Sequence, residues 1–295
     1  MRQEGPAFGV ATLGIATFSL MDAVMKGLTL EMGAYNALLW RTLAGTLISG
    51  MIFYLRDSPW PRRAAWRLHL ERGIIGVASG WLFFWGLARV PLAQGVALSF
   101  IAPLVALYLA ALLLKEKIER RAIFASFLGF AGVLVILSAQ AEAKLGPEAL
   151  QGAIAILVSA ALYGYNIILM RRQALVAGPV EIAFFMSLIM GGGFLLAAPF
   201  LAVVPPAAMI PELFGAAALA FLSLLLLSWA YARAEAQHLA PVEYTAFVWA
   251  AILGLLMFGE VVRPLTLVGA AMIVVACLIA SRRRLVPIPD TEASR

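Results

Sequence analysis

Charged residues are scarce in this sequence of 295 residues, and the shortage decides the class of protein. Asp, Glu, Lys and Arg make up 13% of the chain, whereas 63% of it is hydrophobic. A typical soluble domain is about a quarter charged and about half apolar. The composition therefore excludes a soluble globule and predicts an integral membrane protein with the lipid bilayer as its partner.

Cysteine and histidine are almost absent as well. The chain has one cysteine, Cys277, and two histidines, His69 and His238, both of which we expect in loops. One cysteine excludes a disulfide framework and a thiolate metal site. No Walker A, HExxH or GxSxG motif is present, and Asp22 is the only aspartate expected inside the membrane. We therefore predict no enzyme activity, no ATP drive, no metal and no cofactor.

Long apolar runs dominate what remains. An α-helix needs about 20 apolar residues to cross the hydrocarbon of a bilayer. We expect the first run to be a retained span and not a cleaved signal peptide, because no small-residue cleavage site follows it. Continuous apolar runs favour helices over a barrel, whose strands would alternate. The ten predicted spans are 7–28, 34–55, 73–90, 93–114, 121–139, 150–170, 180–204, 212–232, 240–259 and 264–281.

The basic residues predict the orientation of these spans. Most of the 22 Lys and Arg fall in the loops on the side of the N-terminus, for example in 56–72 and 115–121. Cytoplasmic loops carry an excess of Lys and Arg. Both termini are therefore predicted to be cytoplasmic in a multi-pass protein of the inner (plasma) membrane. Short basic clusters between apolar runs do not favour nucleic-acid binding.

The two halves of the chain are predicted to be repeats. An offset of 144 residues pairs Arg89 with Arg233, Glu116 with Glu260 and Gly132 with Ala276. Five spans in each half would insert the second half upside down relative to the first. We expect repeats at 1–140 and 146–284 and a short cytoplasmic tail at 285–295. Each Glu of the pair is expected to cap the helix that follows it.

Several segments resemble the drug/metabolite transporter superfamily, and its EamA family most closely. They include FSLMDAVMKGL and LLWRTLAG in the first two spans, PLAQGVALSFIAPLVALYLAALLLKEK in the fourth and APVEYTAFVWAAILGLLMFGE in the ninth. The resemblance covers nearly the whole chain. It implies an all-α protein of ten helices in two inverted five-helix repeats, with a substrate cavity between the halves that helices 1, 3, 4, 6, 8 and 9 line.

This resemblance implies a secondary transporter that exports amino acids or related metabolites by alternating access, as YddG-type members do. The alternatives are efflux of drugs or planar cations, and uptake of a metabolite such as S-adenosylmethionine or riboflavin. A lipid scramblase or a pump similar to the small-multidrug-resistance proteins is the runner-up, and a channel is less favoured. The expected state is a monomer or a homodimer.

Ionisable residues inside the membrane are candidates for function. Asp22 and Lys26 lie four residues apart on one helical face, so they form a pair or Lys26 extends to the membrane interface. Arg41 in the second span is expected to bind Asp22 or a helix-end carbonyl. Glu243, beside Tyr244, either lines the cavity or caps a helix start, and its counterpart in the first half is Ser99.

Aromatic and small residues complete the candidate site. Trp81, Trp85, Tyr163 and Asn166 lie in spans that the resemblance places around the cavity, although Trp and Tyr also gather at membrane interfaces. Pro103 is expected to kink the fourth span, because proline has no backbone N–H. Gly132 and Gly191 are predicted to pack or gate, because small residues permit close helix contact.

Overall fold

The computed structural model describes residues 4–114, 120–142, 146–231, 233 and 242–281. Within these residues the protein is helical and contains no strand, as predicted. The helices are α1 (Glu4–Leu55), α2 (Arg63–Leu87), α3 (Leu92–Ser99), α4 (Ala102–Leu114), α5 (Arg120–Glu142), α6 (Gly146–Ala174), α7 (Pro179–Leu195), α8 (Ala198–Leu201), α9 (Ile210–Tyr231), α11 (Thr245–Phe258) and α12 (Pro264–Ser281), with a 3-10 turn at Ala207–Met209.

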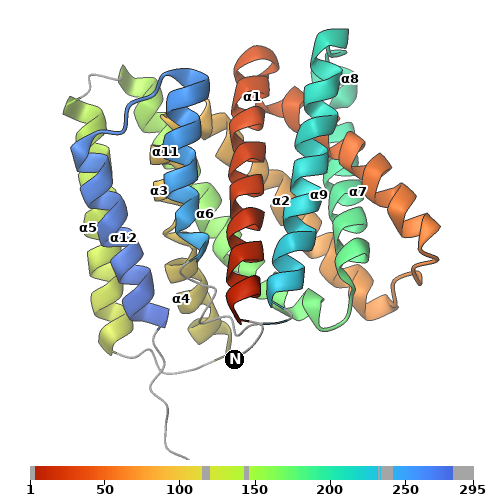
Figure 1. Ribbon diagram of the computed structural model, residues 1–295, viewed down its shortest axis with the longest axis horizontal. Helices are drawn as coiled ribbons and strands as arrows, with labels where there is room; N and C mark the ends of the chain where they lie inside the picture. Colours follow the sequence, from red (N-terminus) through yellow and green to blue (C-terminus); the bar gives the residue numbers. More distant parts are fainter. Residues whose placement is uncertain (1–3, 115–119, 143–145, 232, 234–241, 282–295) are drawn as a thin grey trace, which may run out of the picture.

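The helices lie side by side in one bundle (Figure 1). α5 packs against α12 at one side, α1 packs against α9 in the middle, and α2 packs against both α6 and α7. The α1–α2 and α6–α7 connections lie at the end of the bundle where α1 begins, here called the N-terminal end. The α2–α3 and α11–α12 connections lie at the opposite end, here called the far end.

Helix α1 consists of two limbs that meet at Gly33. This glycine has φ 79° and ψ 154°, a conformation that residues with a Cβ rarely adopt. The first limb runs up the middle of the bundle, and the second descends at a tilt towards α2 and α7 (Figure 1). Gly33 therefore turns one long helical segment into the predicted spans 7–28 and 34–55.

The predicted span 93–114 is broken into α3 and α4. Phe100 and Ile101 form the break, and their amides donate to residues three positions earlier, Ala97 and Leu98. Pro103 follows the break and has no N–H to continue the helical ladder. The predicted span 240–259 has a similar turn at Tyr244, just before α11.

Helix α2 begins ten residues before the predicted span 73–90, so the prediction of a loop over 56–72 is wrong from Arg63 onwards. His69 and Arg72 were expected in this loop, but both are buried in the helix. The cause is tertiary: their side chains bond to α6 and α7, and Trp66 packs on the ring of Phe185 with centroids 5.0 Å apart.

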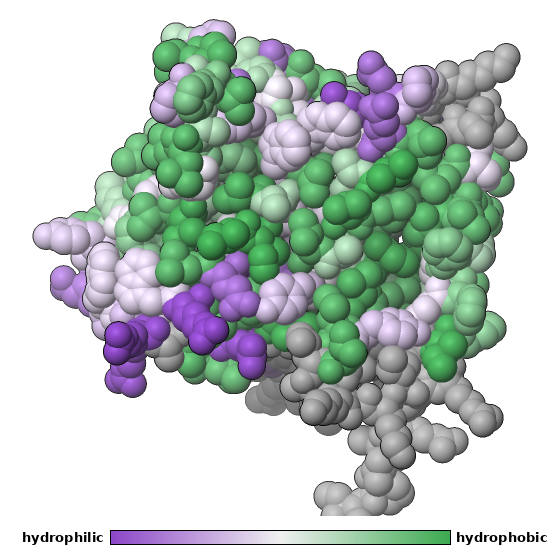
Figure 2. Space-filling view, turned by 180° about the vertical axis from the view of Figure 1, so that it is seen from behind, coloured by the Kyte–Doolittle hydropathy of each residue, from purple (hydrophilic) through white to green (hydrophobic). Residues whose placement is uncertain are grey.

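Apolar surface covers the middle of the rear face of the bundle, and most hydrophilic residues lie above or below it (Figure 2). Three helical stretches have the length and hydropathy to cross a membrane: Pro6–Leu55, Gly146–Met170 and Ala207–Ala230. Shorter apolar helices are Leu92–Ala106, Ile123–Ser138, Pro179–Leu195, Thr245–Phe258 and Pro264–Ile279. The number of ten spans therefore stays a prediction.

Small residues bring α5 and α12 into backbone contact. A Cβ placed on Gly132 would lie 2.8 Å from the carbonyl oxygen of Gly269, and one on Gly269 would lie 2.6 Å from that of Gly132. Gly191 is less crowded, because its Cβ would approach Thr42 Oγ1 only to 3.4 Å. The α5–α12 contact thus depends on glycine at both positions.

We expect Gly132→Leu to destabilise the protein by more than about 1–3 kcal/mol, the usual cost of overpacking, because backbone atoms and not a flexible side chain obstruct the new side chain. The measurement is thermal unfolding of the detergent-purified protein. Gly192→Ala is the matched control, since nothing lies within 4 Å of a Cβ there. Equal melting temperatures for the two variants would contradict this interpretation of the contact.

Candidate functional site

The candidate site is built on the contact between α2 and α6. A Cβ on Gly86 would lie 2.5 Å from the carbonyl oxygen of Gly152, so the two backbones touch near the far end. Seven residues after Gly152 on α6 and seven before Gly86 on α2, the helices meet again: Ser159 Oγ donates to the carbonyl of Ser79 over 2.7 Å. Seven residues is about two turns of a helix, so residues with this spacing share one face.

One further step of seven residues brings Arg72 of α2 against Asn166 of α6. Arg72 Nε donates to Asn166 Oδ1 over 3.0 Å, and Arg72 Nη1 donates to Gln173 Oε1. Arg72 is 8% exposed and Asn166 is 4% exposed. Asn166 was predicted to line the cavity, and the structure shows it holding a buried guanidinium.

The hydrogen-bond network continues from Gln173 to α7. Gln173 Nε2 lies 2.7 Å from His69 Nδ1, and His69 Nε2 lies 3.0 Å from Glu181 Oε1. His69 and Gln173 are each 1% exposed. The network therefore runs from Asn166 to Glu181 and ties α2, α6 and α7 together towards the N-terminal end.

Tyr163 lies one turn from Asn166 on the same side of α6, and from the exposure of its ring we infer a hollow inside the protein. It is two and a half turns from Ile154, whose side chain is on the outer face of α6, so the two point in opposite directions. Tyr163 is nevertheless 45% exposed, although surrounding protein desolvates its hydroxyl. An exposed ring on the inward face of a helix lines internal space.

This hollow lies towards the N-terminal end. Ile156, Tyr163 and Met170 are spaced by seven along the inward face of α6, and their exposed fractions are 0%, 45% and 37%. Because α6 runs from the far end to the N-terminal end, this row of residues is packed near the far end and exposed further along, whereas Asn166 and Gln173 on the adjacent stripe stay buried. The predicted cavity residue Tyr163 marks the point where the space begins.

Asp22 of α1, Arg72 of α2 and Glu243, which precedes α11, lie close enough to Tyr163 for their charges to contribute to its electrostatic environment. Asp22 is 5% exposed, and its charge interacts with that of Arg41 in the second limb of α1. The buried Nε of Arg41 has no hydrogen-bond partner among the described residues. Asp22, Tyr163 and Glu243, predicted separately, thus face one region.

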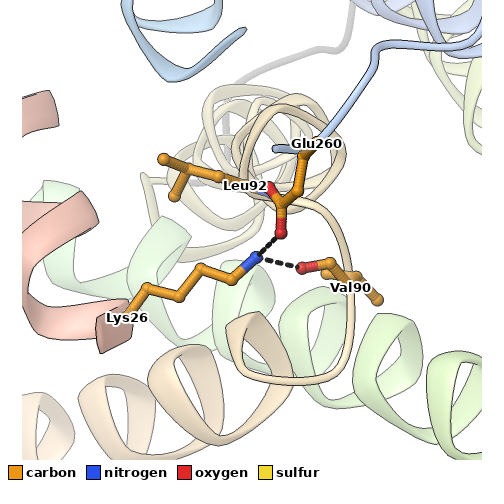
Figure 3. A network of polar contacts seen from close by, with 4 residues as sticks. All are labelled: Lys26, Val90, Leu92 and Glu260. Atoms are coloured by element: carbon orange, nitrogen blue, oxygen red, sulfur yellow. Dashed lines mark hydrogen bonds and ion pairs between the residues drawn. The ribbon is translucent and has the colours of Figure 1, made fainter. Parts of the chain in front are cut away.

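A second polar cluster lies at the far end (Figure 3). Lys26 of α1 donates from Nζ to the carbonyl of Val90 over 2.7 Å and forms an ion pair with Glu260 Oε1. The other carboxylate oxygen of Glu260 accepts the backbone N–H of Leu92, the first residue of α3, over 2.7 Å. One Lys–Glu pair therefore joins α1, the start of α3 and the loop that follows α11.

These contacts correct two predictions. Lys26 does not pair with Asp22 or extend to the membrane interface, because its side chain is 3% exposed and reaches Glu260. Glu260 does not cap the helix that follows it, because its carboxylate caps α3. Gly259 makes this possible: its φ of 66° ends α11 and turns the chain so that Glu260 points back at the bundle. Glu116 and His238 lie outside the described residues.

A pocket of about 470 Å³ lies beside the Lys26–Glu260 pair. Pro91, Gln94, Gly254, Glu260 and Arg263 contribute to its wall. The space is large enough for a small solute. The pocket lies at the far end of the bundle. Tyr163 and Asn166 lie on the opposite side of the Lys26–Glu260 pair.

The other predicted residues have simpler surroundings. Ser99 Oγ donates to the carbonyl of Val96 in its own helix over 2.7 Å. Tyr244 packs edge to face on Phe100 with ring centroids 5.3 Å apart. Trp81 and Trp85 form a tilted pair 6.5 Å apart, and Trp81 lies on the face of α2 that carries the exposed Ile74. A role of the two tryptophans in lining the cavity stays a prediction.

The sequence analysis missed Arg72, Gln173 and Glu260 as candidate site residues. Arg72 was counted as a loop charge, and Glu260 was assigned to a local cap. The spacing of seven in Gly152, Ser159, Asn166 and Gln173 was the available signal, because it marks a polar stripe on an otherwise apolar helix.

Buried ionisable side chains at the centre of an apolar helical bundle, next to an internal hollow, are features of a membrane transporter. Residues 7–138 and 150–282 each match the EamA-like transporter family. The chain therefore belongs to this family, and it is a multi-pass membrane transporter and not an enzyme.

Curated relatives align over almost their whole length. The pseudopaline exporter of Pseudomonas aeruginosa is 27% identical over 281 residues, which cover 93% of this chain and 95% of the exporter. The riboflavin transporter of Rhizobium johnstonii is 27% identical over 291 residues, with 95% and 91% covered. An S-adenosylmethionine uptake transporter of Rickettsia bellii is 24% identical over 268 residues, with 90% of both chains covered.

A protein of known crystal structure has the same fold. It superposes with a TM-score of 0.61 over 94% of this chain and 98% of that protein, at 21% sequence identity.

Proposed function

We propose that the protein is a secondary transporter of small organic solutes that exports amino acids or related metabolites across the inner membrane. One observation carries the proposal: groups of both signs are buried in the bundle, since Asp22 is 5% exposed and Arg72 is 8% exposed, and Arg72 donates to Asn166 one helical turn from the exposed ring of Tyr163. A solute that carries both an amine and a carboxylate complements groups of both signs. The printed names of three relatives, all carriers of small metabolites, support the substrate size.

The mechanism we propose is alternating access between two inverted repeats. Its support is a pair of matching structural features 144 residues apart. Arg89 stacks on Trp85 at 3.6 Å and donates to its carbonyl, and Arg233 stacks on Trp229 at 4.2 Å with the same hydrogen bond. The breaks before α4 and α11 also correspond, at Phe100 and Tyr244, and these two rings touch.

In this mechanism the structure represents a state that is closed at the far end and open at the N-terminal end. The Lys26–Glu260 pair holds α1 against α3 at the far end, whereas Tyr163 and Met170 are exposed further along the inward face of α6. Ten spans, with the basic N-terminal end in the cytoplasm, would make this the inward-open state. A monomer provides all these residues, although a homodimer is compatible with them.

The test is transport by purified protein in proteoliposomes. We expect counterflow of at least one radiolabelled amino acid, with protein-free liposomes as the blank. Riboflavin, S-adenosylmethionine and paraquat serve as competing candidates, because two relatives carry the first two and a planar cation tests drug efflux. A transmembrane pH gradient added in a second series shows whether protons are coupled.

Each result assigns the function. Flux of an amino acid supports the proposal, and its excretion by cells that overexpress the protein supports export. Flux of riboflavin, S-adenosylmethionine or paraquat with none of any amino acid would refute the substrate class but leave a transporter. Accumulation of the amino acid inside the cells would refute the direction.

A further inference from the structure

We infer that Arg72 is the binding site for an anionic group of the transported solute, most simply a carboxylate. This inference rests on the proposed function and adds to it the part of the solute that is recognised and the residue that recognises it. Three observations support it: no described carboxylate contacts Arg72, a network of hydrogen bonds from Asn166 to Glu181 holds its side chain, and its partner Asn166 lies one helical turn from Tyr163.

The charge of Arg72 is not compensated by any described carboxylate in direct contact. Its two hydrogen-bond partners, Asn166 and Gln173, are neutral amides. The adjacent Glu71 accepts the hydroxyl of Tyr165 over 2.5 Å. On α7, Glu181 pairs with His69. A buried charge without a partner costs much free energy, so an arginine kept here indicates a partner that comes and goes.

Donors remain for such a partner. A guanidinium has five N–H donors. Asn166 and Gln173 accept one from Nε and one from Nη1, which leaves one on Nη1 and two on Nη2. Nη1 and Nη2 together form the fork that binds both oxygens of a carboxylate. The two amides therefore leave both hydrogens of Nη2 and one hydrogen of Nη1 for a ligand.

The network behind Arg72 orients it in advance. A carboxylate such as that of Glu181 accepts only, so His69 Nε2 carries the hydrogen. His69 Nδ1 is then the acceptor for the Gln173 amide nitrogen, which turns Gln173 Oε1 towards Arg72. A side chain fixed in this way loses little conformational entropy when it binds a ligand.

The position of Arg72 places the anion near the other charged groups. Its amide partner Asn166 lies one helical turn from Tyr163, and the charges of Asp22 and Glu243 contribute to the electrostatic environment of that tyrosine. A solute with its carboxylate on Arg72 can direct its amine at these two acidic residues. The arrangement selects zwitterions over simple cations, which Arg72 would repel.

The decisive variant is Asn166→Asp. An aspartate at this position still accepts the Arg72 Nε–H, so the contact between α2 and α6 is kept, but it neutralises the guanidinium permanently. We expect the transport efficiency for a radiolabelled amino acid to fall by roughly tenfold or more, as a lost charge-assisted bond implies, while the melting temperature is unchanged or higher. Arg72→Gln should lose the same transport and also stability.

Asn36→Asp is the matched control, because it makes the same charge change at the far end, where Asn36 Oδ1 accepts the amide of Val203. We expect it to transport normally. The second substrate is the amine that corresponds to the amino acid without its carboxylate. The inference requires that wild-type protein prefers the acid and that Asn166→Asp reduces or reverses this preference.

The outcomes separate this inference from the proposed function. Normal amino-acid transport by Asn166→Asp would show that Arg72 is only structural, and equal wild-type transport of the amine would also overturn the inference, while the transporter assignment stands. If wild-type protein moves no amino acid, the proposed substrate class fails. In that case the test of Arg72 is whether glutamate or acetate raises the melting temperature of the detergent-purified protein. The inference survives only if wild-type protein shows this rise and the Asn166→Asp variant does not.

Discussion

Lys26→Met is expected to abolish transport and to destabilise the protein by about 3–5 kcal/mol, the usual cost of removing one partner of a buried ion pair. The methionine fills similar space but leaves the partly buried Glu260 carboxylate without its cation. Lys26 also donates to the carbonyl of Val90, which would lose its partner. The measurements are thermal unfolding in detergent and counterflow in proteoliposomes.

A series of variants distinguishes the two roles of Glu260. Glu260→Gln keeps an oxygen that can accept the Leu92 N–H, so it should be milder than Lys26→Met. The double variant Lys26→Met/Glu260→Gln should be more stable than Lys26→Met, because no unpaired charge remains. The exchange Lys26→Glu/Glu260→Lys should not restore the protein, because a lysine cannot accept the N–H of Leu92.

The role of this pair in closing the far end can be measured by thiol labelling. In a Cys277→Ala background, a cysteine at Tyr163 should react slowly with an impermeant maleimide added at the outer face. In the double variant Lys26→Met/Glu260→Gln the rate should rise by about tenfold or more, since losing about 1.4 kcal/mol of differential stabilisation shifts the two states by that factor. Equal rates would show that the pair stabilises the fold without closing the hollow.

Asp22→Asn is expected to stop transport and to lower stability by a similar amount. Asp22 provides the negative charge that interacts with Arg41, and an asparagine would leave that guanidinium buried without it. The double variant Asp22→Asn/Arg41→Gln removes both charges, so it should regain most of the stability. It should not regain transport, because the carboxylate beside Tyr163 is still missing.

These variants need the same two measurements, the melting temperature and the counterflow rate. Normal counterflow by Asp22→Asn would show that Asp22 has no part in transport. Recovery of both stability and counterflow in the double variant would assign Asp22 to the fold alone.

The positions of the helices followed largely from the sequence. Runs of apolar residues predicted most of each long helix that the structure describes, and Pro103 marked the break before α4. Gly132, predicted to pack or gate, lies at the close contact between α5 and α12. These features are local or compositional: a helix satisfies its own backbone, and a glycine or proline acts where it stands. The start of α2 was missed because polar residues over 63–72 look like a loop when their partners are unknown.

The partners of the charged residues did not follow from the sequence. Spacing alone paired Lys26 with Asp22, four residues away, whereas the structure pairs it with Glu260, which is 234 residues away. The sequence also predicted that Arg72 and His69 lie in a solvent-exposed loop, whereas both are buried against α6 and α7.

The sequence by itself determined that the chain lies in lipid, is helical and carries a few buried charges, because composition and periodicity suffice for these properties. Only the tertiary structure decided which charges meet and which have no counter-charge in direct contact. The physical reason is that an ion pair forms between whichever side chains the packing of distant helices brings within reach, and no spacing along one helix contains that information.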